Sequence, residues 1–256
     1  MMIVYLFIHR TKIEPITVNV AWQKRLALLV LLVSLLFGLF TYNFLPILDF
    51  LPYKIGSNIP ESMKIPEGET PDEFLIMYQL KNKATGETKT MSDKDYLKLE
   101  VWKDNNWEVV GNPEKKLIKK GYDVKIKDLL IADASGTDYT KEIVENPYYS
   151  LVVVAYDLKN TNENAIAATN ALALNAADQF NIRTVLLTSN SAQDADTFSK
   201  RMKLFMEVFY ADAVPLKSMV RANPGILLLK NGVIINKWHY HNLPSFNELS
   251  EKYFTK

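Results

Sequence analysis

The chain has 256 residues, which predicts one or two domains, and its 30 basic and 29 acidic residues leave a formal net charge of +1. A charge this close to zero provides no global field for nucleic acid, so we expect no nucleic-acid partner. The chain contains no cysteine, which excludes disulfides, thiolate nucleophiles and cysteine-ligated zinc or iron–sulfur clusters.

The first quarter of the chain contains an apolar stretch, residues 26–48, without a charged side chain. As a helix it would be about 34 Å long, enough to cross a hydrocarbon core of about 30 Å. A buried core helix and a cleaved signal peptide are the alternatives. The stretch begins late for a signal peptide, and no small-residue cleavage site follows it. We therefore predict an uncleaved transmembrane helix.

The flanking charges predict the orientation of this helix. Four basic residues precede it, whereas Asp49 and a single nearby cation, Lys54, follow it. Because the basic flank stays in the cytoplasm, we expect residues 1–25 inside a bacterial inner membrane and the remainder in the periplasm. Residues 1–8 are apolar but too short to span. They look like the end of an earlier membrane helix, as if the chain were the C-terminal part of a longer one.

A proline-rich connector, residues 49–73, predicts an extended linker or surface arm. Residues 74–127 predict a small β-rich module packed on the domain that follows, beginning with a hairpin and a short helix from Asp93 to Leu99. A local cluster of lysines lies in this module, and we interpret it as a solvated face rather than a lipid-binding site. These lysines are Lys115, Lys116, Lys119 and Lys120.

Residues 128–256 predict an α/β domain. Its β-branched run from Ser150 to Tyr156 is typical of a strand that is buried on both faces. Asn231-Gly232 between two apolar runs is a strong signal for a hairpin turn. The remaining expected elements are strands at 128–132 and 182–188, helices at 162–180 and 194–210, a helical turn at 216–222, hairpin strands at 226–230 and 233–239, and a final helix at 245–254.

This β-α-β-α-β-β-α order is that of the thioredoxin fold. The segment RANPGILLLKNGVIINKW resembles the stretch of that family in which a cis-proline precedes the hairpin, and Pro224 falls on that proline. The segment DLLIADASGTDYTKEI resembles the TlpA and peroxiredoxin branch. The family's redox cysteines follow the first core strand, where residues 157–163 contain none. The domain therefore cannot act as a thiol–disulfide oxidoreductase by itself.

The chain also resembles the C-terminal part of bacterial DoxX-family membrane proteins. The resemblance rests on LPYKIGSNIPESMKIPEG after the apolar stretch and on RANPGILLLKNGVIINKWHYHNLP near the end. Those proteins carry a four-helix membrane domain before this point. The resemblance implies a fragment or split product, with no activity of the membrane domain carried over.

The predicted site lies where the proline loop meets the loop after the first core strand. If the fold is correct, Asn223, Pro224 and Gly225 lie beside Asp157 and Lys159. Extended peptides pair with this loop in thioredoxin-like folds, so a partner-binding groove is the functional interpretation. The alternative is that the proline serves the fold alone.

His239 and His241 are two residues apart near a strand end, so their side chains can share a face. A metal site would need a third ligand such as Glu248 or Asp212. The alternative is a pair of surface histidines, and we expect no cofactor.

The sequence favours a non-enzymatic module that binds a membrane or periplasmic protein, without settling whether any catalytic activity exists. The alternatives are an accessory subunit of a DoxX-type membrane oxidoreductase unit and a histidine-based metal-binding domain.

Overall fold

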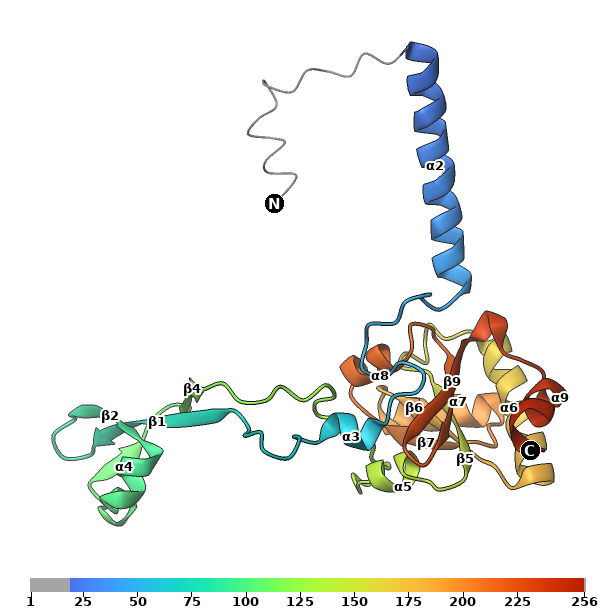
Figure 1. The fold of residues 1–256 in the computed structure, drawn as a ribbon. Coiled ribbons are helices and arrows are strands. Elements are labelled where there is room, and N and C mark those ends of the chain that lie inside the picture. The colour runs from blue at the N-terminus through green and yellow to red at the C-terminus, as the bar shows by residue number, and fades with distance from the viewer. Residues whose placement is uncertain (1–18, 256) are drawn as a thin grey trace.

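The structure, a computed structural model, describes residues 19–255, and its first element is α2 (Val20–Asn43). The Asn19 side chain caps the helix by accepting a hydrogen bond of 2.9 Å from the Ala21 amide. The apolar window of α2 has a mean hydropathy of 2.2 and is 0% buried. Among the described residues, α2 is the one helix long and apolar enough to cross a membrane, as an anchor or as a signal sequence. Figure 1 shows it projecting from the domain, with only its C-terminal end close to the rest of the chain.

α2 begins and ends earlier than the predicted span of residues 26–48. Phe44 is extended, with φ −129° and ψ 154°, and Pro46 disfavours a helical conformation at Leu45. The helix therefore ends before the apolar stretch does. Its start at Val20 lies within residues 1–25, which we predicted to precede the span. Residues 1–18 of that segment, including the apolar residues 1–8, lie outside the described residues.

The domain below α2 contains a five-stranded sheet of order β7-β6-β5-β8-β9. β5, β6 and β7 are parallel, whereas β8 is antiparallel to β5 and β9 is antiparallel to β8. A parallel pair extended by an antiparallel hairpin is the core of the thioredoxin fold, and the predicted fold class is confirmed. The strands are β5 (Tyr149–Val154), β6 (Arg183–Thr188), β7 (Glu207–Tyr210), β8 (Gly225–Lys230) and β9 (Val233–His239).

Helices cover both faces of this sheet. Val152 and Val154 belong to a core shared with two short helices, whereas Leu151 and Val153 belong to the cores on the other face. This alternation explains why β5 reads as a continuous apolar run. The first face carries α5 (Thr140–Val144) and α8 (Ala213–Met219). The second carries α6 (Glu163–Phe180), α7 (Ala192–Met202) and α9 (Phe246–Leu249), which continues into a π-helical turn (Ser250–Phe254).

The chain between α2 and the domain is bound to the edge of this sheet. We call residues 44–59 the strap. Its Gly56 amide donates to the Ile234 carbonyl at 2.8 Å, and its Ile59 amide donates to the Gly232 carbonyl at 2.8 Å. Ile59 is 1% exposed and starts α3 (Ile59–Met63). The strap is therefore part of the domain and covers the open edge of β9, whereas the sequence predicted a linker here.

A buried ion pair fixes the strap near its start. The Asp49 carboxylate pairs with the Lys237 ammonium of β9, and the two side chains are 18% and 8% exposed. The ammonium also donates to the carbonyls of Tyr53 at 3.0 Å and Met219 at 3.2 Å, and the Leu51 amide donates to Asp49 Oδ1 at 3.0 Å. Both charges are thus paired and hydrogen-bonded, as buried charges must be.

We predict that Asp49→Asn lowers the free energy of unfolding by about 3–5 kcal/mol, because it leaves the Lys237 ammonium buried without a counter-charge. The double variant Asp49→Leu/Lys237→Met should lose less of its free energy of unfolding than Asp49→Asn does, since it removes both charges. Chemical unfolding of the full chain in detergent, followed by tryptophan fluorescence, measures both values. A single variant as stable as the double one would contradict the prediction.

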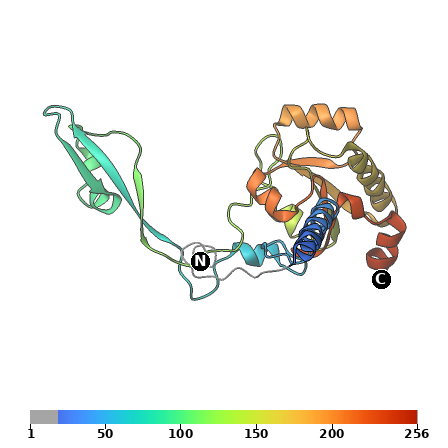
Figure 2. The same ribbon diagram turned by 90° about the horizontal axis from the view of Figure 1, so that it is seen from above.

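Residues 73–119 form an arm that projects to one side of the domain (Figures 1 and 2). At its root the Gly121 amide donates to Asp72 Oδ1 at 2.7 Å. The β-rich module predicted over residues 74–127 corresponds to this arm, whose last strand ends at Lys119. The arm does not pack on the domain as predicted, because it projects away from it. The arm comprises β1 (Glu73–Asn82), β2 (Thr88–Ser92), α4 (Asp93–Lys98), a 3-10 turn (Val101–Lys103), β3 (Trp107–Val109) and β4 (Glu114–Lys119).

Two predicted elements of the domain differ in the structure. The predicted helix 194–210 ends at Met202, because Lys203 adopts the left-handed conformation with φ 51°. Residues 207–210 instead form the edge strand β7, where Phe209 is buried. The predicted strand 128–132 is reduced to isolated bridges from Ala132.

Candidate functional site

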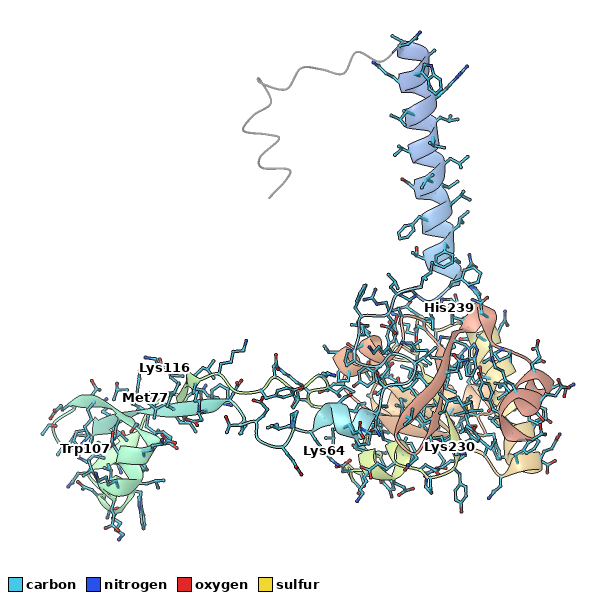
Figure 3. All side chains as sticks on the ribbon, in the orientation of Figure 1. Lys64, Met77, Trp107, Lys116, Lys230 and His239 are labelled. Atoms are coloured by element: carbon cyan, nitrogen blue, oxygen red, sulfur yellow. The ribbon has the colours of Figure 1, made fainter. Side chains whose placement is uncertain are left out.

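The register of the sheet places the predicted site at the end nearest α2. Val154, the last residue of β5, pairs with Gly225, the first residue of β8, and Gly225 pairs with His239. Figure 3 shows His239 beside the end of α2 and Lys230 at the opposite end of the sheet. The loops that follow β5 and precede β8 therefore both face the α2 side.

The structure brings the predicted partner-binding residues together. The Asn223 Nδ2 group donates to the Asp157 carbonyl at 2.7 Å, and the Asn162 amide donates to the Asn223 carbonyl at 3.2 Å. The Asn223-Pro224 peptide bond is cis, as the resemblance implied. Asn162 caps α6 by accepting a hydrogen bond of 3.0 Å from the Ala165 amide. The proline loop is thus joined to the start of α6.

The accessible part of this site is polar, because its centre is closed. Pro224 and Gly225 are buried, and a Cβ on Gly225 would lie 2.3 Å from Val220 Cγ1, so the close packing requires glycine here. Lys159 is exposed. Hydrogen bonds from the Asn160 side chain and the Lys159 amide lower the pKa of Asp157, which keeps its carboxylate charged. The site offers a charged rim rather than an open groove over the proline.

Two tyrosines that the sequence analysis did not single out lie where the last turn of α2 meets the domain. Burial raises the pKa of Tyr240, and the neighbouring Tyr42 hydroxyl of α2 raises it further. The Asn242 Nδ2 group donates to the Asn43 carbonyl at 2.6 Å, and the rings of Tyr42 and His241 are 5.6 Å apart. The last turn of α2 therefore lies against the end of the sheet that carries the site.

Two polar atoms of the site have no hydrogen-bond partner among the described residues. They are Asn223 Oδ1 and Thr161 Oγ1, and both are buried. A hollow of about 300 Å³ opens between the Lys159 loop and α7. Its lining includes the cations Lys159 and Arg201 and the carboxylate of Asp194. The hollow is thus lined by charged and apolar side chains together, since Leu158 and Phe198 also border it.

The two candidate metal ligands are adjacent, but the third ligand is missing. The rings of His239 and His241 lie 4.9 Å apart, and the His241 amide donates to His239 Nδ1 at 3.2 Å. The Glu248 carboxylate is engaged by Ser245 in a capping box. Among residues 19–255, no group of three or more His, Cys, Asp or Glu side chains could hold a metal ion, so neither Glu248 nor Asp212 completes a site.

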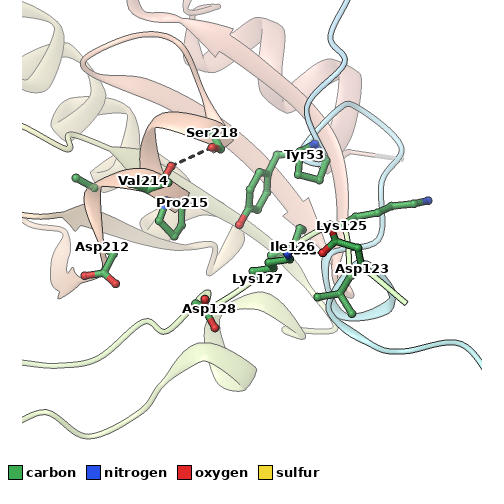
Figure 4. Close-up of a pocket in the computed structure, with 13 residues that line it drawn as sticks. Tyr53, Asp123, Lys125, Ile126, Lys127, Asp128, Asp212, Val214, Pro215 and Ser218 are labelled. Atoms are coloured by element: carbon green, nitrogen blue, oxygen red, sulfur yellow. Dashed lines mark hydrogen bonds and ion pairs between the residues drawn. The ribbon is translucent and has the colours of Figure 1, made fainter. Parts of the chain in front are cut away.

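A second hollow of the domain lies elsewhere and was not predicted. Figure 4 shows it between the strap, residues 123–128 and α8, with a volume of about 580 Å³. Tyr53 of the strap lines it and is 2% exposed, and burial raises the pKa of its hydroxyl. Asp123, which also lines it, is paired with Lys127. The lining segments are distant in the sequence, so no local pattern could have indicated this hollow.

The chain was compared with known families, curated proteins and solved structures. No protein-family model matches the chain, and no curated protein matches it. Solved structures similar to it include a thiol:disulfide interchange protein from Bacteroides sp. (14% identity, 50% of this chain, 86% of that chain, TM-score 0.39). They also include a secreted Mycobacterium tuberculosis disulfide oxidoreductase (14% identity, 48% of this chain, 92% of that chain, TM-score 0.37). A third is StoA from Bacillus subtilis (15% identity, 50% of this chain, 95% of that chain, TM-score 0.37). Such likeness transfers no activity, and the fold assignment rests on the strand order described above.

The buried His239 predicts a pH dependence of stability. Burial, with the neighbouring His241, lowers its pKa below the ordinary value, so the unfolded chain binds a proton that the folded chain does not. The contribution of His239 to the free energy of unfolding should therefore be fully present above about pH 6.5 and decrease as the pH falls below that value. Thermal unfolding of the full chain between neutral and mildly acidic pH measures this fall. His239→Gln should flatten it more than His241→Gln does, and equal slopes in the two variants would argue against the assignment.

Proposed function

We propose that the chain is a membrane-anchored module that faces the periplasm and binds a partner protein through the rim formed by Asn223, Asp157 and Lys159. The observation that carries the proposal is the position of this rim. It lies at the end of the sheet against which α2 packs, so a protein in or near the membrane can reach it. The joined loops and the polar rim supply a rigid surface for recognition.

The anchor and its direction are supported by α2 and its flanks. α2 is apolar on all sides, as expected of a helix in lipid, and Lys24 and Arg25 lie near its start. Asp49, the first charged residue beyond its end, is paired with Lys237 of the domain. Positive charge at the start favours a cytoplasmic N-terminus and a periplasmic domain in a bacterial inner membrane.

The absence of cysteine supports a role without redox chemistry. Disulfide exchange needs a thiolate as nucleophile and as leaving group, and the loop at residues 157–163 offers amide, hydroxyl, ammonium and carboxylate groups instead. The charged Asp157 and the exposed Lys159 can contact a partner, but neither can accept electrons from a dithiol.

We predict that the purified full chain does not accelerate insulin reduction by dithiothreitol above the uncatalysed rate. A variant with cysteines at Lys159 and Asn162 provides a control, because it restores thiols to the same loop. Turbidity of the insulin B chain measures the rate. Activity of the natural chain above background would refute the redox-inactive assignment.

The partner-binding proposal predicts position-dependent crosslinking. A photo-crosslinking residue at Lys159 should capture a membrane or periplasmic protein in intact cells, whereas the same residue at Lys230, exposed at the other end of the sheet, should not. Asn223→Ala should weaken the capture from position 159, because it removes the 2.7 Å hydrogen bond that joins the two loops. Equal capture from both positions, or none from 159, would contradict the proposal.

The second candidate function is an accessory subunit of a DoxX-type membrane oxidoreductase unit. The sequence resemblance motivates it, and the packing of α2 against the site end of the domain is compatible with a neighbouring membrane subunit. The identity of the captured protein separates the two candidates. A quinone- or thiol-linked oxidoreductase favours the accessory role, and any other protein favours a general binding module.

A further inference from the structure

The end of α2 continues into a loop in which three large apolar side chains are exposed, whereas Leu45 packs against the core of the domain. We call residues 44–51, the first part of the strap, the apolar loop. Phe50 is 90% exposed, Ile47 is 83% exposed and Leu48 is 71% exposed. Such large apolar side chains, adjacent in sequence and turned outward, mark a surface that is covered in the working state of a protein.

The position of the apolar loop indicates what covers it. The uncharged part of α2, residues 26–43, is about 27 Å long, slightly less than a hydrocarbon core of about 30 Å. The residues directly after Asn43 therefore lie at the level where the hydrocarbon core meets the headgroups. The backbone there is irregular, which excludes the hydrocarbon core but suits the wetter interface, where an amphipathic ring such as that of Tyr42 in the last turn of α2 is favoured.

The only ionisable side chain in the apolar loop is turned inward. Asp49 lies between Leu48 and Phe50 in sequence, but its carboxylate pairs with Lys237 inside the domain. The ion pair therefore removes the one charge that would oppose insertion into lipid, and it holds the neighbouring side chains outward. Lys54 and Lys125 line the same hollow as Phe50, where their ammonium groups can meet lipid phosphates.

We infer that the apolar loop, through Ile47, Leu48 and Phe50, is seated in the outer interface of the bilayer and holds the site end of the domain against the membrane surface. The inference deepens the proposed function and rests on its membrane anchor. Lipid is therefore the molecule that covers this surface. The partner that binds the candidate site must approach it along the membrane surface.

Because the chain contains no cysteine, a single introduced cysteine can be labelled specifically, and the depth of the label in the bilayer can be measured. We would attach a nitroxide label to single-cysteine variants of the full chain, Ile47→Cys and Phe50→Cys, in vesicles of phosphatidylethanolamine and phosphatidylglycerol. Tyr148→Cys is the matched control, because this aromatic residue is 76% exposed and next to Tyr149, which pairs with Lys230 at the far end of the sheet. Leu32→Cys in α2 reports the span itself.

The labels at Ile47 and Phe50 should collide several-fold more often with oxygen, relative to a water-soluble nickel chelate, than the label at Tyr148. Values equal to that of Tyr148 would overturn the seating. If the Leu32 label remains in lipid in that case, the anchor stands and only the seating fails. If the Leu32 label is also in water, the anchor of the proposed function fails together with the seating.

Discussion

The ion pair between Asp49 and Lys237 is the constraint on which the arrangement of the molecule depends. It joins the start of the strap to β9, six residues after α2 ends. β9 also pairs with β8, whose first residue, Gly225, follows the cis-proline. One strand therefore fixes both the segment that leaves α2 and the loop of the candidate site, so the two cannot move independently.

The same geometry shows how a thioredoxin fold can keep its two site loops joined without a thiol between them. The loop after β5 is still tied to the proline loop by the hydrogen bonds of Asn223 and Asn162. These bonds involve backbone and amide groups and need no thiol. What remains is a preorganised rim with a charged carboxylate at Asp157 and an ammonium at Lys159, which suits binding more than chemistry.

The sequence carried the local features of the fold but not the contacts between distant segments. The β-branched run at residues 150–156 and the Asn231-Gly232 turn predicted β5 and the β8–β9 hairpin correctly, because periodicity and turn chemistry are local. The helix expected at 194–210 ends at Met202, because Lys203 adopts the left-handed conformation. Glycine is the residue that usually indicates this conformation in a sequence, and here the residue is lysine. The pairing of Asp49 with a lysine 188 positions away has no local signature either, so a proline-rich segment read as a linker.

That last difference changes the physical picture of the protein. A flexible linker of about 25 residues would let the domain wander roughly 25–30 Å from its anchor, so the site would sample many heights and orientations. The strap instead holds the domain at Asp49, immediately after the span, and Tyr42 packs beside His241. Under the proposed function, a partner would meet the site at one height and in one orientation, which reduces the entropy lost on binding within the membrane plane. In the function we propose, the rigidity of the strap contributes more than the chemistry of the rim to the choice of a membrane partner over a freely diffusing one.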